Sequence, residues 1–127
     1  NPFYPHGIMS DLHQFFEERI SACLAAGIKE QQLILDPGFG FGKQVVDNLM
    51  LMKHLDELAC FKLPLLLGVS RKSTIGAILK NEPDQRLIGS IVLAVCALTK
   101  GANILRVHDV AETLQAVKLI QAIKQAQ

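Results

Sequence analysis

An apolar run that ends in polar or charged side chains occurs three times along this chain, and a helix-like pattern follows each run. The runs are ILDPGFG from Ile34, LLLGVSRKS from Leu65 and ILRVHDV from Ile104. Their polar ends are about 35 residues apart, which is the length of one strand–helix unit. Such units predict parallel strands joined by right-handed crossovers, with polar side chains gathered at the carboxyl ends of the strands.

The spacing of apolar residues predicts an α/β fold. We expect three parallel strands, and the segments that form them are 33–36, 65–69 and 104–107. A first helix is expected to start at a cap from Ser10 or Asp11 and to end at Gly27. After the glycine-rich segment, apolar residues from Leu51 to Ala59 form the stripe of a second helix.

The second half of the chain carries three further helical patterns. A short helical turn is expected at 73–79. Residues 87–98 are apolar on nearly all sides, and a helix of that kind must be covered on its outer face, so we expect it in a subunit interface. Asp109 and Glu112 make a capping-box-like start to the last helix.

Composition and charge exclude several classes of function. Of the 127 residues, 50% are hydrophobic and 20% charged, and the formal net charge of +1 gives no electrostatic case for binding nucleic acid or an anionic membrane. No apolar run approaches the roughly 20 residues of a membrane-spanning helix. Cysteines in helix-like apolar stripes, without CxxC spacing, predict reduced core residues of a cytoplasmic protein. They are Cys23, Cys60 and Cys96.

The segment DPGFGFGK, from Asp36 to Lys43, fits neither of two familiar phosphate-binding motifs. A P-loop would need glycine at Pro37 and Ser or Thr at Gln44. A dinucleotide fingerprint would need its glycines to open directly into a helix. We therefore interpret residues 36–43 as a glycine-rich turn whose backbone can approach a ligand closely, and we call this segment the glycine turn.

Three side chains of the glycine turn are candidates for ligand contact. Phe39 and Phe41 are costly to expose to water, so at least one is expected to pack against a flat ligand or a neighbouring loop; alternatively, both plug the end of the fold. Asp36, at a strand end, suits paired hydrogen bonds from the edge of an amino-heterocycle. Its alternative roles are a helix cap or a structural salt bridge.

Basic groups follow the second and third predicted strands. The segment Ser70 to Ser73 opens a helical turn, where backbone N–H groups, the hydroxyls and Lys72 favour an anion or a carbonyl; the alternative is a solvated surface. Arg106 and His108 are two residues apart, so in extended backbone they point the same way and suit a phosphate; the alternative is a structural pair. Together these residues predict a site for a flat heterocycle bearing a phosphate or diphosphate.

The motifs resemble those of the dihydropteroate synthase family. DPGFGFGK, GVSRKS, the Gly89-Ser90 pair and RVHDV match in order and spacing over nearly the whole chain. Family members are (β/α)₈ barrels of roughly twice this length. The resemblance therefore implies that residues 1–127 form a partial pterin-binding domain, the C-terminal part of a TIM barrel with strands 6 to 8 and their helices.

An activity follows from this resemblance. Family members are transferases that condense 6-hydroxymethyl-7,8-dihydropterin diphosphate with p-aminobenzoate, giving 7,8-dihydropteroate and pyrophosphate in folate biosynthesis. The resemblance implies three catalytic residues: Asp36 would hold the amino-pyrimidine edge of the pterin, Lys72 would bond the pterin ring, and Arg106 would flank it. Arg106 and His108 would hold the diphosphate.

The second substrate and the metal are implied in the same way. Phe41 would wall the aminobenzoate pocket, and Ser73 would contact the aminobenzoate carboxylate. The further candidate substrate-binding residues are Gly40 and Gly68. Mg²⁺ would bind the diphosphate, with ligands mostly outside this chain, because the family's N-terminal loops supply an asparagine near the metal. We therefore expect the isolated chain to be inactive or weakly active.

Two alternatives remain beside this interpretation. One is a pterin-binding methyltransferase of the methyltetrahydrofolate type, against which the lysine-bearing segment from Ser70 to Ser73 argues. The other is a non-catalytic half-barrel assembly module, which would have lost its polar strand ends. A partial barrel has open strand edges, so we expect a homodimer or another form of self-association, through the helix at 87–98, edge pairing or exchange of elements.

Overall fold

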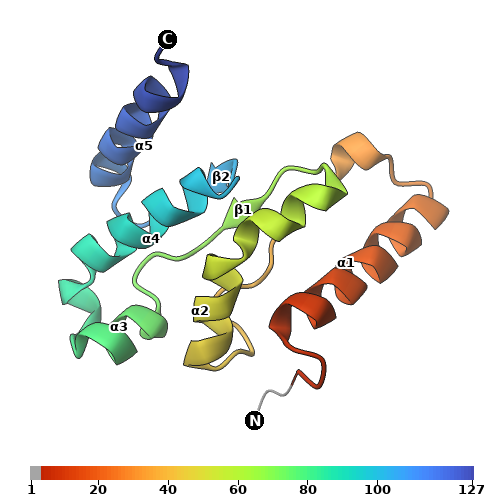
Figure 1. Ribbon diagram of the computed structural model, residues 1–127, viewed down its shortest axis with the longest axis horizontal. Helices are drawn as coiled ribbons and strands as arrows, with labels where there is room; N and C mark the ends of the chain where they lie inside the picture. Colours follow the sequence, from red (N-terminus) through yellow and green to blue (C-terminus); the bar gives the residue numbers. More distant parts are fainter. Residues whose placement is uncertain (1–3) are drawn as a thin grey trace.

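Helices surround a short parallel sheet in the computed structural model, which describes residues 4–127 (Figure 1). The helices are α1 (Ile8–Ala25), α2 (Val45–Lys53), α3 (Ser73–Leu79), α4 (Leu87–Thr99) and α5 (Val110–Gln125). The strands are β1 (Leu66–Leu67) and β2 (Ile104–Leu105), and short 3₁₀ helices cover Glu30–Gln32, Leu55–Phe61 and Pro83–Gln85. The chain is therefore an α/β protein that is mostly helical.

The sheet contains two strands within the described residues, so the prediction of three is wrong. β1 and β2 pair in parallel, as the crossover pattern predicted. The segment 33–36 runs parallel to the chain entering β1 but contributes one isolated bridge, between Leu35 and Leu65. The register of the strand pair places Leu66 opposite Ile104 and Leu67 opposite Leu105.

Backbone chemistry explains why this first segment stops at a single bridge. The N–H of Leu35 donates to the Pro64 carbonyl at 2.9 Å, and the Leu35 carbonyl accepts from the N–H of Leu66 at 2.8 Å. The next bond of the ladder would need an N–H on residue 37, which is a proline. On the other side, the N–H of Leu33 already closes the 3₁₀ helix Glu30–Gln32.

The first helix starts earlier than predicted. Gly7, with φ of 85°, occupies the N-cap position, so Ser10 and Asp11 lie inside the first turns and do not cap the helix. Asp11 still places a negative charge near the positive end of the helix. The prediction that the helix ends near Gly27 is confirmed: the last helical residue is Ala25, and Gly27 has φ of +92°.

The predicted second helix is divided, whereas the next two are as expected. The stripe from Leu51 to Ala59 breaks at His54, where α2 gives way to the 3₁₀ helix Leu55–Phe61. Leu51, Met52, Leu55 and Leu58 still face the core, whereas Ala59 is exposed. α3 covers the predicted residues 73–79, and α4 begins at the predicted Leu87.

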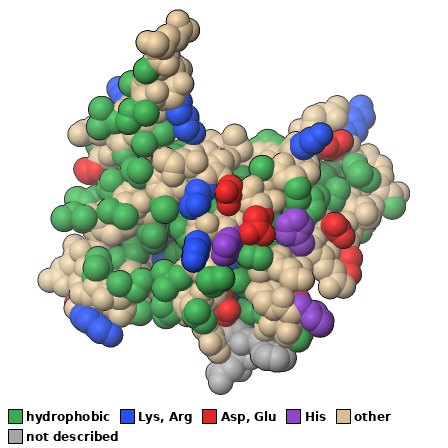
Figure 2. Space-filling model, in the orientation of Figure 1, with side chains coloured by type: hydrophobic (Ala, Val, Ile, Leu, Met, Phe, Trp, Pro, Cys, Tyr) green, Lys and Arg blue, Asp and Glu red, His purple; other side chains and the backbone are tan. Residues whose placement is uncertain are grey.

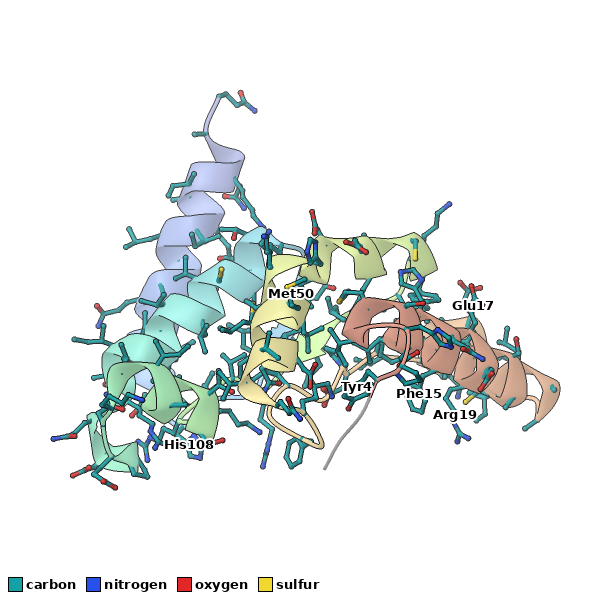
Figure 3. The ribbon with its side chains drawn as sticks, turned by 60° about the horizontal axis from the view of Figure 1, so that its bottom comes forward. Tyr4, Phe15, Glu17, Arg19, Met50 and His108 are labelled. Atoms are coloured by element: carbon teal, nitrogen blue, oxygen red, sulfur yellow. The ribbon has the colours of Figure 1, made fainter. Side chains whose placement is uncertain are left out.

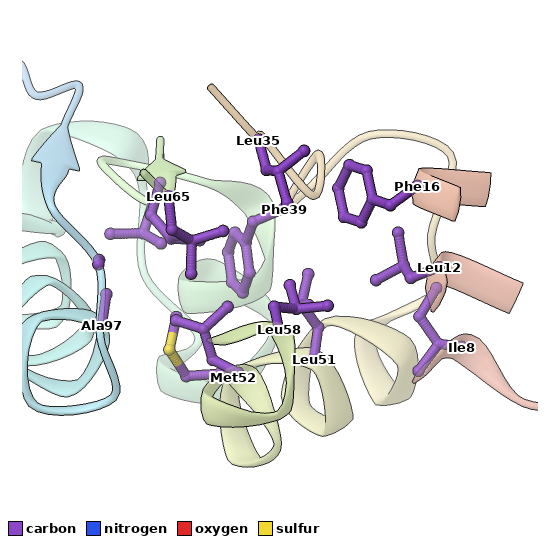
Figure 4. Packing of buried hydrophobic residues seen from close by; sticks show 14 of the residues in the cluster. Ile8, Leu12, Phe16, Leu35, Phe39, Leu51, Met52, Leu58, Leu65 and Ala97 are labelled. Atoms are coloured by element: carbon purple, nitrogen blue, oxygen red, sulfur yellow. The ribbon is translucent and has the colours of Figure 1, made fainter. Parts of the chain in front are cut away.

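The core lies between the sheet, α1, α2 and the 3₁₀ helix that follows α2 (Figure 4). Phe39, from the glycine turn, is only 2% exposed, and its ring lies among Leu35, Leu65 and Leu58. One of the two aromatic residues of the turn is therefore a core residue. Its burial anchors the turn to the body of the molecule.

Much apolar surface stays uncovered on the other side of the molecule. α5 projects from the body at the end opposite α1 (Figure 1), and hydrophobic side chains gather over α3, α4 and α5 in Figure 2. On α4, Ile88 is 75% exposed and Val92 is 59% exposed. Between positions 4 and 127, no helix combines the length and the hydropathy needed to cross a membrane.

The cysteines differ partly from the prediction. All three are free thiols, as expected. Cys23 and Cys96 are half-buried, but Cys60 is exposed, with its Sγ 3.9 Å from the ring nitrogens of His13. The description of Cys60 as a core residue is therefore wrong, because the chain at this point has left α2 and turns in a surface 3₁₀ helix.

Candidate functional site

The ends of β1 and β2 form a small polar cavity at one edge of the sheet. Its volume is about 100 Å³. It is lined by Gly68, Ser70, Lys72, Arg106, Val107 and His108. Parallel pairing brings the ends of the two strands together. Gly68 lies beside Arg106: a Cβ at residue 68 would stand 3.9 Å from the Arg106 Cβ.

The glycine turn reaches the same place through Lys72. The Lys72 ammonium lies 4.0 Å from the centre of the Phe41 ring, within the range of a cation–π contact. Phe41 is 65% exposed, so one face of the pair remains open to a ligand. Gly40 has φ of +84°, a conformation that favours glycine, and a Cβ there would make a tight 3.0 Å contact with the Lys72 side chain.

Two of the predicted catalytic residues, Arg106 and Asp36, influence the pKa of the third, Lys72. Burial lowers the pKa of Lys72, and the nearby Arg106 cation lowers it further. The carboxylate of Asp36 acts in the opposite direction and raises it. Lys72 therefore lies within electrostatic reach of both an acid from the glycine turn and a cation from the end of β2.

Asp36 is exposed at the mouth of a second, larger cavity of about 340 Å³. Its Oδ1 accepts a hydrogen bond from the N–H of Gly38 at 2.9 Å, which shapes the start of the glycine turn. Within residues 4–127, no ion pair involves Asp36, and no hydrogen bond uses its Oδ2. The helix-cap and salt-bridge alternatives are thus not what the structure shows, and Oδ2 can face a ligand.

Lys43 stabilises the glycine turn through hydrogen bonds to its backbone. Its ammonium donates to the carbonyl oxygens of Gly38 at 2.9 Å and of Phe41 at 3.1 Å. Burial lowers the pKa of Lys43, and the carboxylates of Asp36 and Asp47 oppose that effect. The turn that carries Phe41 is therefore held in shape by its own last residue.

His108 is held by the serine at the end of β1. Its backbone N–H donates to Oγ of Ser70 at 3.3 Å, and its Nδ1 lies 2.8 Å from the same oxygen. Nε2 is the ring nitrogen that can still bond a ligand. Figure 3 shows His108 at the edge of the molecule from which the glycine turn also projects.

Arg71 has a structural role beside this site. Its φ of 55° lies in the left-handed region, which a non-glycine residue adopts at a cost. The surroundings fix it: its N–H donates to Oγ of Ser90 at 2.8 Å, and its carbonyl accepts from Arg86 at 3.0 Å. Its guanidinium pairs with Asp109 at 2.8 Å, and this bond raises the pKa of Arg71.

The ion pair also corrects the prediction of a capping box. Asp109 occupies the N-cap position of α5, but its side chain makes no capping hydrogen bond, since the carboxylate faces Arg71. The hydroxyl of Thr113 instead donates to the Asp109 carbonyl at 2.7 Å. Sequence spacing could not show this, because the two charges lie on different strand–helix units.

Ser73 and a buried amide lie next to the residues of this site. Ser73 is the first residue of α3 and is exposed beside Lys72. Asn48 of α2 and Thr74 of α3, neither of which the sequence identified as candidates, are buried and hydrogen-bonded to each other. The sequence did hold a signal for Asn48: it lies three and four positions before Leu51 and Met52, a spacing that places a polar residue on the apolar face of α2.

The residues at this edge do not form a metal site by themselves. No group of three or more His, Cys, Asp or Glu side chains able to hold a metal occurs in the described part of the chain. The cavity at the strand ends is lined by the cations Lys72 and Arg106, whereas Mg²⁺ prefers carboxylate and water oxygens. The arrangement suits an anionic group and a flat ring instead.

Comparison with known proteins gives one consistent result. The family described as "Pterin binding enzyme" matches residues 1–108. Dihydropteroate synthase from Haemophilus influenzae is 48% identical over 126 residues, which are 99% of this chain and 46% of that protein.

Solved structures give the same picture. Yersinia pestis dihydropteroate synthase superposes with a TM-score of 0.95 at 50% identity, over 98% of this chain and 51% of that one. The Xanthomonas albilineans enzyme in complex with 7,8-dihydropteroate gives 0.95 at 42% identity, over 99% of this chain and 48% of that one. The present chain thus spans about half the length of the relatives that it matches.

Proposed function

This chain belongs to the pterin-binding enzyme family, and on that premise we propose that it forms the C-terminal, substrate-binding part of a dihydropteroate synthase barrel. The complete protein would join a hydroxymethyl-dihydropterin diphosphate to p-aminobenzoate and release pyrophosphate. The observation that carries this proposal is the convergence of the glycine turn and both strand ends on Lys72.

The pterin would bind between the strand ends and the acid of the glycine turn. Oδ2 of Asp36 would accept hydrogen bonds from the amino-pyrimidine edge, and Lys72 would donate to the ring. Gly68 leaves room for a flat ring, because only hydrogen stands where a side chain would narrow the small cavity. Arg106 would flank the ring on its other side.

The aminobenzoate would bind on the outer side of Lys72. The exposed ring of Phe41 offers it an aromatic wall, and Gly40 keeps the backbone of the turn close. The hydroxyl of Ser73 would bond its carboxylate. The arylamine nitrogen would then point toward the methylene carbon of the pterin.

The chemistry requires stabilisation of a leaving group and no nucleophile from the protein. The C–O bond between the methylene and the diphosphate breaks, and pyrophosphate leaves with the electron pair. The arylamine nitrogen forms a C–N bond to that carbon and loses a proton. Arg106 and Nε2 of His108 would bond the departing oxygens, where preorganised donors lower the barrier most.

We propose that Mg²⁺, if bound to the diphosphate, takes its ligands mostly from parts of the protein beyond this chain. The donor set at the strand ends does not fit a divalent cation. No step above is therefore assigned to a metal.

Two alternatives have less support. A methyltetrahydrofolate-type methyltransferase would also bind a pterin, but the similar proteins described above are dihydropteroate synthases, and Lys72 over Phe41 provides for a second, aromatic substrate. A non-catalytic assembly module would not need Asp36, Lys72, Arg106 and His108 within one reach, yet the chain retains all four.

We further propose that α4 mediates formation of a homodimer. Ile88 and Val92 of α4 are exposed, and they line an apolar cavity of about 260 Å³ together with residues of α2 and α3. No charged residue lines that cavity, so the surface suits a second copy of the same apolar helix. The free thiols of all three cysteines favour a reducing, cytoplasmic location for the protein.

The proposed reaction is tested by supplying both substrates with Mg²⁺ to the complete protein and to this chain alone. We expect pyrophosphate release by the complete protein only when p-aminobenzoate is present. The isolated chain should bind the pterin diphosphate weakly, as seen by calorimetry, and show little or no turnover. Absence of dihydropteroate from the complete protein would overturn the proposal, while rapid turnover by the isolated chain would show that the rest of the barrel is not needed.

A further inference from the structure

A single buried amide joins the glycine turn to the segment that carries Lys72. Asn48, in the first turn of α2, is 3% exposed, and its Oδ1 accepts a hydrogen bond from the N–H of Gly40 at 2.8 Å. Its Nδ2 donates to Oγ1 of Thr74 at 3.0 Å, and Thr74 is 2% exposed. One side chain thus bonds both sides of the proposed substrate pocket.

The partners of Asn48 are immediate neighbours of the residues proposed to bind aminobenzoate. Gly40 precedes Phe41, and Thr74 follows Ser73 in α3. The cation–π contact between Lys72 and Phe41 joins the same two segments on the surface. The buried amide and the surface contact therefore fix the same separation from two sides.

The chemistry of the link is specific to an amide. Asn48 accepts on one atom and donates on the other, so it satisfies a backbone N–H and a threonine hydroxyl at once. An apolar residue of the same size would leave both groups buried or partly buried without partners, which is costly. The link is therefore a defined contact and not general packing.

We propose that Asn48 and Thr74 are positioning residues that set the width of the aminobenzoate pocket. The inference rests on the proposed function. The Asn48 amide holds Phe41 and Ser73 at the separation that the aryl ring needs, without touching the substrate itself. The pterin side of the site depends on Gly68 and Arg106, which the amide does not contact.

This arrangement has a selective consequence. Breaking the link lets the glycine turn move relative to α3, so the pocket between Phe41 and Ser73 loosens. The strand ends that hold the pterin stay paired by the sheet. The KM for p-aminobenzoate should therefore rise, while the affinity for the pterin diphosphate should change little.

The test uses the complete protein with the substitution Thr74→Val, which keeps the side-chain volume and removes the hydroxyl. We expect the KM for p-aminobenzoate to rise by roughly three- to tenfold, the effect of one lost buried hydrogen bond, and the Kd of the pterin diphosphate to stay within about twofold. Thr74→Ser retains the hydroxyl and should restore the normal KM. Asn48→Ser, too short to reach both partners, is a second variant with the same expectation as Thr74→Val.

A matched control separates positioning from simple destabilisation. Thr113 is also buried, at 6% exposure, and its hydroxyl bonds only within the start of α5, so Thr113→Val should lower thermal stability without a selective change in KM. Equal changes for both substrates, or a stability loss in Thr74→Val and Asn48→Ser without a selective rise, would overturn the inference. An unmodified protein that makes no dihydropteroate would reject the proposed function first, and this inference with it.

Discussion

Lys72 is the residue on which the contacts of the site converge. It lies over the Phe41 ring, packs against Gly40, and lines the cavity that also contains Arg106 and His108. Its partial burial lowers its pKa, and the Arg106 cation lowers it further. Burial disfavours the charged form of a lysine, so an anionic or carbonyl partner from a ligand would stabilise that form.

Replacement of Lys72 tests this assignment in the complete protein. Lys72→Ala should lower kcat/KM by about a hundredfold or more, as loss of a preorganised donor does. Its melting temperature should change little, because the substitution removes a partly desolvated charge. Lys118→Ala, on the exposed surface of α5, is the control and should be silent in both measurements. Kinetics of Lys72→Ala that match the unmodified protein would reject the role of Lys72.

The lowered pKa of Lys72 predicts a pH dependence of binding. Affinity for the pterin diphosphate should fall as the pH rises through this pKa, and the fall should begin below the ordinary lysine value of 10.5. Between the lowered pKa and 10.5 the unfolded chain binds more protons, so this group makes the free energy of unfolding rise with pH across that window. Lys72→Arg should shift the loss of binding to higher pH in a titration, since the guanidinium stays protonated. An unchanged alkaline limb in Lys72→Arg would exclude Lys72 as its cause.

At the level of elements, the loops after the strands are fixed by contacts between different strand–helix units. Ser70 holds His108, Asp109 holds Arg71, and Asn48 holds Thr74. Each contact bridges two of the repeating units, so no unit can form its part of the site alone. The glycine turn is in addition anchored by the burial of Phe39.

Helix α4 carries the clearest prediction at this scale. Ile88→Asp should weaken self-association by roughly ten- to a hundredfold, because a charge replaces an apolar side chain that dimerisation would bury. Analytical ultracentrifugation measures the dissociation constant. Ile123→Asp is the control, because Ile123 on α5 is similarly exposed and does not line the cavity between α4, α2 and α3. An unmodified protein that sediments as a monomer, or equal effects of both substitutions, would contradict a role for α4.

At the level of the whole molecule, the chain leaves apolar surface uncovered and spans about half the length of the relatives that it matches. α5 projects from the body (Figure 1), and a cavity of about 460 Å³ with a mostly apolar lining lies between α4, β2 and α5. The sheet has two strands and one bridge within residues 4–127, and matched relatives are about twice as long. These features explain why catalysis is proposed for the complete protein and only weak binding for this chain.

The sequence by itself determined the parallel pairing of the second and third predicted strands, the positions of α3 and α4, and the motifs that identify the family. These depend on local periodicity and on residues close together in the chain, which a sequence displays directly. The same local information identified Asp36, Lys72 and Arg106 as polar residues that follow apolar segments.

Only the tertiary structure decided how those side chains are used. In the folded chain Phe39 is buried and Phe41 is exposed. The Asp109 carboxylate pairs with Arg71 instead of capping the helix, and the first predicted strand forms only a bridge at Leu35. Each outcome depends on a group from a distant part of the chain or on a backbone bond that Pro37 cannot make. Such pairings arise from the packing of separate units, and periodicity within one unit carries no information about them.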